Sequence, residues 1–324
     1  MGVDVTVLVS SSDNTMPFDP EIGCVPDFAD TSSGYEVVNR LNTIMQGTHV
    51  VVSGWHGFQA WSSLIRARIA RRLTLGIRFD SVGFTERNGL LKKFAVARPF
   101  IALRTADVWH PTGRLALHYA QQLSLTRRTS VDIPYVSDPA KFFPNRNSLV
   151  KDRGPLRILV VSKLNTREGV ETAVRSVAML SDVEMTVVGD GPERRRIEEL
   201  ASSLGAGVNF VGYVKYEDLP AYYHNTDLFI HPSNDEPWGV SVQEAMHAGV
   251  PVLASSRVGS ALELISLPRN SWCFEPGDHM RLAQLIDALK IGRFREEMIQ
   301  ANFRAVESAS PQAVAIRLAE FLSK

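Results

Sequence analysis

Six short apolar runs alternate with helical segments through the second half of the chain. The runs occupy residues 157–161, 185–189, 208–212, 228–232, 251–255 and 272–276. They are mainly apolar, which is typical of strands buried on both faces of a parallel sheet. Helical patterns, such as those at 168–180 and 192–204, lie between them. This half is therefore predicted to be a doubly wound α/β domain, whose ligands bind beyond the carboxyl ends of the strands.

The first half shows the same alternation less regularly. Strands are expected at residues 3–10, 49–54, 73–79, 106–111 and 129–135. A length of 324 residues favours two domains. The chain turns polar between residues 136 and 156, and we place the boundary there, near residue 150. The expected division is an N-terminal domain at 1–150, a second domain at 151–310, and a C-terminal helix at 311–324 that could pack on either domain.

The charge and the cysteine content exclude several classes of protein. Lys and Arg number 35 and Asp and Glu also number 35, so no net positive field indicates a nucleic-acid partner. No run of 18 apolar residues and no secretory signal pattern is present. Cys24 and Cys273 fit no metal-binding spacing and are expected to be free thiols. We therefore expect a cytoplasmic protein.

Positive charge is concentrated in the first domain. Residues 60–130 hold thirteen Lys or Arg against three acidic residues. Within them, segments 64–72 and 90–100 mix basic and apolar side chains. Such a surface can bind anionic lipid with about 1 kcal/mol per cation, which would place the protein peripherally on the inner face of the cell membrane. A solvated helix face is the alternative.

The stretch NDEPWGVSVQEAMHAGVPVLAS, residues 234–255, contains a Pro-Trp-Gly turn followed by a predicted helix from Trp238 to His247. A Gly at position 249 is the expected C-terminal stop. The unpaired backbone amides of Gly239 and Val240 at the start of this helix would face the ligand edge of the sheet. They form a ready site for a phosphate group.

Two glutamates flank this turn. Glu244 falls on the second turn of the helix, where its carboxylate can accept two hydrogen bonds from ribose hydroxyls. Glu236 lies on the loop before the helix, nearer to the group that the phosphate carries. Alternatively both are surface carboxylates, with Glu236 stabilising the helix N-terminus by about 0.3 to 1 kcal/mol.

Other strand ends carry further candidate ligand-binding residues. Arg257 and Gly259 follow the run at 251–255, and Gly259 precedes a short helix that can cradle an anion through its backbone. Lys163 and Arg167 follow the run at 157–161 and supply cations at the same predicted edge.

The order of these motifs between residues 162 and 265 resembles the C-terminal domain of the retaining glycosyltransferases of family 4. The motifs are SKLNTREGVETAVRSVAML, VVGDGPERRRIEEL and VNFVGYVKYEDLPAYYHNTDLFIHPSNDEPWGVSVQEAMHAGVPVLASSRVGSALELI, which include two glutamates separated by seven residues. The resemblance implies the GT-B fold, in which two Rossmann-like domains face a cleft. The first domain of this chain would be shortened at its N-terminus.

The resemblance also implies a donor and an acceptor. The donor is a nucleotide sugar held by the second domain, and the acceptor is a saccharide or a lipid-linked glycan that approaches from the first. Glu244 would bind the ribose and Glu236 would lie near the donor sugar. Backbone groups of the chain would contact the rest of the donor. Gly239 and Val240 would meet the diphosphate or the sugar, and the segment from Gly212 to Val214 would lie against the base.

GT-A transferases bind their metal through two aspartates that are separated by one residue. This sequence contains no such pair. The resemblance therefore implies a metal-independent reaction without a cofactor. Lys163 and helix N-termini would then neutralise the leaving diphosphate. Retention is expected through attack from the front face, with the leaving phosphate taking the acceptor proton, so no protein nucleophile is needed.

The chain departs from the family pattern in two places. Relatives commonly carry an Arg followed five residues later by Lys-Gly, whereas this chain has Lys163 followed by Glu168-Gly169. Losing one charge-assisted hydrogen bond costs about 1.5 to 3 kcal/mol, and Arg167 or Arg257 could replace the charge. The opening GVDVTVLVS also resembles the second strand of the family's usual first domain. This suggests that the true start lies upstream, that the chain is truncated, or that the domain is naturally reduced. A missing central strand would expose sheet edges.

The first domain offers candidates for acceptor recognition. Arg78 and Asp80 follow the strand at 73–79 and correspond to a position near the donor sugar and acceptor in the family. A structural turn role for Asp80 is nearly as well supported. His110 precedes a helix that starts at a glycine, and His56 lies in a second loop. Structural loop histidines are the alternative for both.

These observations favour a metal-independent, retaining transferase that moves a hexose or similar sugar from a nucleotide-diphosphate donor, in bacterial surface polysaccharide biosynthesis. Two alternatives stay open. A sugar-nucleotide epimerase or hydrolase on the same fold would turn over the donor without acceptor. An inactive sugar-nucleotide-binding subunit would bind without turnover.

Overall fold

The computed structural model describes residues 8–10, 27–29, 49–53, 62, 65, 66, 68–70, 73–80, 99–124, 128–143, 154–265 and 272–322. The chain forms two compact units. Unit 1 comprises Met1–Pro111, Ala116–Ile133 and Arg317–Lys324, and unit 2 comprises Thr112–Leu115 and Pro134–Ile316. The predicted boundary near residue 150 lies in 144–153, outside the described residues.

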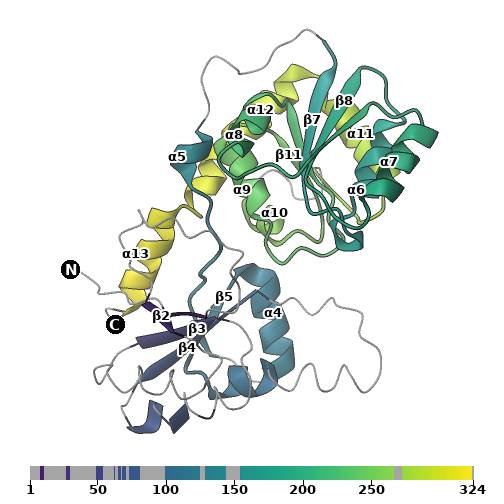
Figure 1. Cartoon of the computed structure of the whole chain (residues 1–324). Helices are drawn as coiled ribbons and strands as arrows, with labels where there is room; N and C mark the ends of the chain where they lie inside the picture. The colour runs from purple at the N-terminus through teal and green to yellow at the C-terminus, as the bar shows by residue number, and fades with distance from the viewer. Residues whose placement is uncertain are drawn as a thin grey trace. The chain divides into compact units, whose positions relative to one another are not determined.

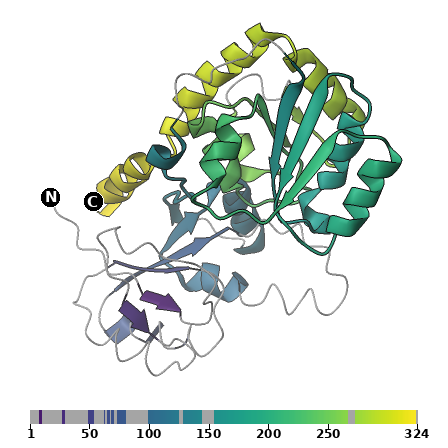
Figure 2. The ribbon, with the colours of Figure 1, turned by 45° about the horizontal axis from the view of Figure 1, so that its top comes forward.

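Unit 2 contains a six-stranded parallel sheet, drawn in teal and green in Figures 1 and 2. Its strand order is β12-β11-β10-β7-β8-β9. The strands are β7 (Leu156–Val161), β8 (Val183–Val188), β9 (Val208–Gly212), β10 (Leu228–His231), β11 (Val252–Ser255) and β12 (Cys273–Phe274). All six coincide with predicted apolar runs, so the predicted doubly wound sheet is confirmed. The order reverses between β7 and β10, and ligands bind at such a switch point.

Helices cover both faces of this sheet (Figure 1). One face carries α6 (Val170–Val177), α7 (Arg194–Ser203) and α11 (His279–Leu289); the other carries α8 (Leu219–His224), α9 (Val240–His247), α10 (Gly259–Leu264) and α12 (Gly292–Glu307). Consecutive strand residues enter opposite cores: Ile158 packs in the first and Leu159 in the second, and both are 1% exposed. Because both faces of the central strands are buried, the strand sequences are mainly apolar, with Arg157 and His231 among the exceptions.

Two helices of unit 2 start later than the sequence pattern predicts. The segment expected to be helical from residue 168 first forms a 3₁₀ turn, Thr166–Glu168, and α6 begins only at Val170. The helix expected from Trp238 begins at Val240. In both cases a glycine with a left-handed backbone precedes the helix, Gly169 with φ +61° and Gly239 with φ +89°. A left-handed residue interrupts helical geometry, which fixes the later starts.

Unit 1 contains a four-stranded parallel sheet in the order β3-β4-β5-β6, which are His49–Ser53, Thr74–Phe79, Val108–Pro111 and Thr129–Ser130. A separate parallel pair joins β1 (Leu8–Ser10) to β2 (Asp27–Ala29). The strand predicted at 129–135 stops at Ser130. Two more amides, from Val131 and Ile133, still donate to carbonyls at 109 and 111. Pro134 has no N–H and cannot extend the ladder.

Two histidines of unit 1 pack against the C-terminal helix. The helix α13 (Pro311–Leu322) was predicted at 311–324, and its last turns belong to unit 1. The ring of Phe321 lies 5.8 Å from that of His49 and 6.3 Å from that of His110. Between Gly113 and Ser124 the chain forms α4, which follows β5.

Other sequence expectations find partial counterparts. Within the residues that the structure describes, no helix combines the length and apolarity needed to cross a bilayer. In the basic segment 64–72, Arg68 pairs with Asp107 and Ile69 is 74% exposed. Nearly all of segment 90–100 lies outside the described residues, as does Cys24, whereas Cys273 is a half-buried free thiol.

Candidate functional site

The loops that follow β7 and β10 at the switch point are bonded to each other. The backbone amide of Asn234 donates to the Arg167 carbonyl at 2.7 Å, and its side-chain amide donates to the Thr166 carbonyl at 2.8 Å. The backbones approach so closely at Gly169 that a Cβ there would lie 2.1 Å from the Pro232 carbonyl oxygen. The two loops therefore form one structural unit.

Glu236 lies in the second of these loops, with its backbone fixed by the loop after β11. Its amide donates to the Arg257 carbonyl at 3.1 Å and its carbonyl accepts from the Gly259 amide at 3.0 Å. A Cβ at Gly259 would lie 2.0 Å from the Pro237 carbonyl oxygen, so only glycine fits this contact. The Glu236 carboxylate accepts from the Trp238 amide at 3.2 Å. Its pKa is raised, first by burial, against the effect of that hydrogen bond.

The N-terminus of α9 follows immediately. Gly239 caps the helix with a left-handed backbone, and its carbonyl accepts from the Ser260 hydroxyl at 2.9 Å. The first amides of a helix have no intrahelical acceptor and carry the positive end of the helix dipole. Gly239 and Val240 therefore stand where the sequence predicted an anion cradle.

Glu244 is buried on the second turn of the same helix, with 6% of its surface exposed. The hydroxyl of Tyr223, which is fully buried on α8, donates to its carboxylate at 2.7 Å. Burial raises the pKa of Glu244 to about 6, while the Tyr223 hydrogen bond and the charge of Lys141 oppose the shift. The carboxylate is thus oriented by one protein hydroxyl and keeps further acceptor capacity for a ligand.

The family resemblance implies that Glu244 binds the ribose of a nucleoside diphosphate, and the raised pKa of Glu244 predicts that this binding weakens in acid. Only the ionised carboxylate accepts hydrogen bonds through both oxygens, so the affinity should be constant above about pH 7 and fall as the pH drops from 7 to 5. The nucleotide's terminal phosphate titrates near pH 6 as well. The measured quantity is therefore the ratio of dissociation constants between wild type and Glu244→Gln at each pH. A ratio that does not change between pH 7 and 5 would contradict the assignment.

The stability of the fold should change with pH in the opposite sense. An acid whose pKa is higher in the folded than in the unfolded state favours folding when it is protonated. The contribution of Glu244 is fully present below its unfolded pKa and is lost as the pH rises through about 6.

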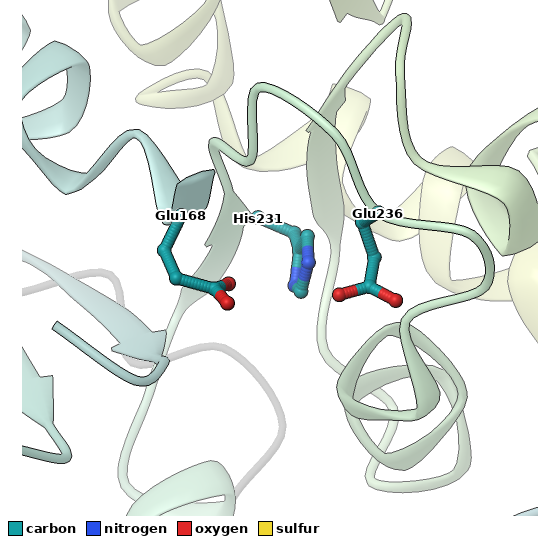
Figure 3. Close-up of side chains that lie close together, drawn as sticks. All are labelled: Glu168, His231 and Glu236. Atoms are coloured by element: carbon teal, nitrogen blue, oxygen red, sulfur yellow. The ribbon is translucent and has the colours of Figure 1, made fainter. Parts of the chain in front are cut away.

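Glu236 lies close to two other side chains that come from different segments, Glu168 and His231 (Figure 3). Glu168 comes from the 3₁₀ turn after β7, His231 is the last residue of β10, and Glu236 belongs to the following loop. One ligand atom from each lies within 4.8 Å of the others. Burial raises the pKa of Glu168 and lowers that of His231 to about 4. The cluster is therefore a polar centre within a largely buried environment.

The remaining predicted residues of unit 2 lie in the loops after β7 and β11 and at the end of β9. Lys163 is exposed in the loop after β7, and the guanidinium of Arg167 donates to the Asp235 carbonyl at 2.9 Å. Arg257 is half-buried in the loop after β11. Gly212 ends β9 with φ +87°, and half-buried Val214 follows it. Their roles in donor binding stay predictions.

The candidates of unit 1 form a separate group. Arg78 and His110 are register partners on β4 and β5, and half-buried Asp80 follows β4. The His110 ring is fully buried; its Nδ1 lies 3.1 Å from the Val131 carbonyl and its Nε2 lies 3.1 Å from Nε2 of His49. Nδ1 must donate to the carbonyl, so Nε2 accepts from His49. Both His110 nitrogens thus have protein partners, and its role in acceptor binding stays a prediction. His56 lies outside the described residues.

Sequence reasoning missed two residues of the site. His231 interrupts an apolar strand, LFIHP, and a single polar residue inside a buried run is the signal that could have identified it. Tyr223 reaches Glu244 from another helix, which no local pattern reveals.

Comparisons with known proteins identify the family of this chain. The family model described as "Glycosyl transferases group 1" matches residues 142–305. A 2-deoxystreptamine glucosyltransferase of Streptomyces kanamyceticus is 31% identical over 56% of this chain and 51% of its own length. A lipopolysaccharide core biosynthesis glycosyltransferase of Rhizobium meliloti is 26% identical over 45% of this chain and 40% of its own length. The matches thus span about half of these relatives or less.

A solved structure shows the same fold. HepE from Anabaena, in complex with UDP and glucose, matches 90% of this chain and 81% of its own with a TM-score of 0.70 and 21% identity. The predicted GT-B class of α/β fold is thereby confirmed. Because the family model covers slightly more than half of the 324 residues, the chain belongs to the group 1 glycosyl transferases.

Proposed function

We propose that this protein is a retaining glycosyltransferase that moves a hexose or similar sugar from a nucleoside-diphosphate sugar to a saccharide or lipid-linked acceptor. The observation that carries the proposal is the arrangement around α9. Its N-terminal amides at Gly239 and Val240 lie between the carboxylates of Glu236 and Glu244, which suits a ligand with sugar, diphosphate and ribose in line.

In this reaction the bond between the anomeric carbon and the diphosphate oxygen breaks, and a bond to the acceptor oxygen forms on the same face. The acceptor proton passes to the leaving diphosphate. The helix N-terminus stabilises the negative charge that develops there. Glu236 contacts the donor sugar, and Glu244 holds the ribose hydroxyls.

The biological setting is part of the same proposal. The Rhizobium meliloti relative is named for lipopolysaccharide core biosynthesis, which supports a role in building a bacterial surface polysaccharide. In this role the enzyme would lie on the cytoplasmic side of the cell membrane. Its basic segments 64–72 and 90–100 would bind the anionic membrane surface. The solved relative with UDP supports a nucleotide donor.

Thermal unfolding with UDP, GDP and ADP tests donor binding. A diphosphate present at a hundred times its dissociation constant should add roughly 2.7 kcal/mol to the stability, and the nucleotide that does so identifies the base. The matching nucleotide sugars are then assayed for diphosphate release with and without saccharide acceptors. Release that needs an acceptor supports transfer, whereas release without one indicates a hydrolase, and no stabilisation by any of the three would refute the proposal.

A further inference from the structure

Glu168, His231 and Glu236 together present a ligand set that the proposed sugar transfer does not explain. Their three ligand atoms lie within 4.8 Å of one another, and Figure 3 shows the imidazole between the two carboxylates. Each carboxylate has a weak hydrogen bond from the protein: the Ser162 hydroxyl is 3.3 Å from Glu168, and the Trp238 amide is 3.2 Å from Glu236. Two acidic groups brought this close repel each other unless a proton or a cation lies between them.

The histidine supplies an independent observation. His231 is 95% buried, and its Nε2 has no hydrogen-bond partner although it is inaccessible to water. Its other ring nitrogen, Nδ1, lies 3.0 Å from the Ser241 hydroxyl oxygen. When Nδ1–H donates to this oxygen, the Nε2 lone pair is free for a ligand, and the imidazole lies between the two carboxylates (Figure 3). Metal-binding histidines are held in this way, with the second nitrogen donating to an oxygen acceptor.

We propose that Glu168, His231 and Glu236 bind a divalent transition-metal ion. Three ligands of one ion, each about 2.0 to 2.3 Å from it, lie roughly 3.3 to 4.0 Å from one another, so side-chain rotations that bring these atoms closer by up to about 1 Å would close the cluster. Two carboxylates and one imidazole suit Mn²⁺ or Zn²⁺ better than Ca²⁺ or Mg²⁺, which prefer oxygen ligands alone. Three protein ligands leave coordination positions open for a substrate.

The position of the ion suggests its role, which rests on the proposed function. Glu168 puts a negative charge in the loop after β7, close to the predicted diphosphate site. The nearby Arg167 guanidinium bonds to the Asp235 carbonyl and lies 3.7 Å from its carboxylate. A divalent ion bound by Glu168 and Glu236 cancels the two carboxylate charges, and its open coordination positions can bind a diphosphate oxygen. The sequence-based expectation of a reaction without metal, which rested on the absence of a GT-A aspartate pair, is the alternative that the experiments below distinguish from this role.

Metal binding is tested with the ion alone. The full chain is stripped with EDTA, dialysed and titrated calorimetrically with MnCl₂ and, separately, with ZnCl₂. We expect one ion per chain from at least one of the two metals. Glu168→Gln, which keeps the side-chain shape, and His231→Gln should each weaken that binding by at least tenfold. The matched control is Glu184→Gln, which removes an exposed carboxylate from β8 of the same sheet and should leave the affinity unchanged.

Circular dichroism melting of each variant verifies that it is folded. No binding of either metal, or equal affinity in wild type and in folded Glu168→Gln, would overturn the site and would indicate that the carboxylates share a proton instead. This result does not depend on whether the protein binds a nucleotide.

The role of the ion is measured separately, by the affinity for UDP, or for GDP or ADP if one of these stabilises the protein. The ion should tighten diphosphate binding by about 5- to 150-fold in the wild type and leave it nearly unchanged in Glu168→Gln. An ion that binds without changing the diphosphate affinity would overturn the role. Failure to bind any of the three nucleotides would count against the proposed function and not against the metal site.

Discussion

Replacing Glu244 by glutamine is expected to weaken nucleoside diphosphate binding by about ten- to a hundredfold. Glu244 is 6% exposed and is oriented by the Tyr223 hydroxyl. Losing a charge-assisted hydrogen bond costs about 1.5 to 3 kcal/mol, and every 1.4 kcal/mol is a factor of ten in affinity. Isothermal titration with the diphosphate that stabilises the protein measures the effect.

The companion variant is Tyr223→Phe, which keeps the carboxylate and removes only the hydroxyl that orients it. Its loss of affinity should be less than tenfold, because a neutral donor contributes about 0.5 to 1.5 kcal/mol. If Glu244→Gln binds the diphosphate as tightly as wild type, Glu244 does not contact the ribose. A larger effect from Tyr223→Phe than from Glu244→Gln would lead to the same conclusion.

Replacing Gly169 by alanine should destabilise unit 2 by about 3 kcal/mol or more. An alanine there would adopt a strained left-handed backbone, and its Cβ would meet the Pro232 carbonyl oxygen at 2.1 Å. The loops after β7 and β10 would have to separate, which would also displace Glu168 from Glu236. Urea unfolding followed by circular dichroism gives the change in free energy of unfolding.

Gly205→Ala is the matched control for this substitution. Gly205 has φ +63° against +61° at Gly169, and a Cβ there would have open space around it. This variant therefore adds backbone strain alone, about 1 kcal/mol. The difference between the two variants measures the close approach of the loops. Equal destabilisation would show that the loops can separate at little cost.

The fold of unit 2 could be predicted from the sequence because its signal is local. A parallel sheet buried on both faces favours long apolar runs in its strands, and the runs at 157–161 and 228–232 are apolar except at Arg157 and His231. The starts of α6 and α9 were predicted two residues too early. Whether the glycine before each helix adopts a left-handed backbone depends on its tertiary neighbours. Gly239 has a left-handed backbone, and a Cβ there would lie 3.0 Å from the Val258 side chain and 3.2 Å from that of Glu236, tertiary neighbours that the sequence pattern does not display.

The site was predictable where one segment carries several groups. Glu236, Gly239 and Glu244 lie within nine residues, so loop and helix geometry relates them directly. The cluster of Glu168, His231 and Glu236 depends on how two loops 60 to 70 residues apart are joined by the bonds of Asn234, which sequence spacing cannot reveal. Glu168 stood out in the sequence as a departure from the family pattern, but only the fold brings it beside His231.

A crystal structure with the bound nucleoside diphosphate tests the central claim most directly. We predict the diphosphate against the amides of Gly239 and Val240, with the ribose hydroxyls on the Glu244 carboxylate. A nucleotide bound elsewhere, with these groups free of ligand, would contradict the assignment of the site and the function built on it.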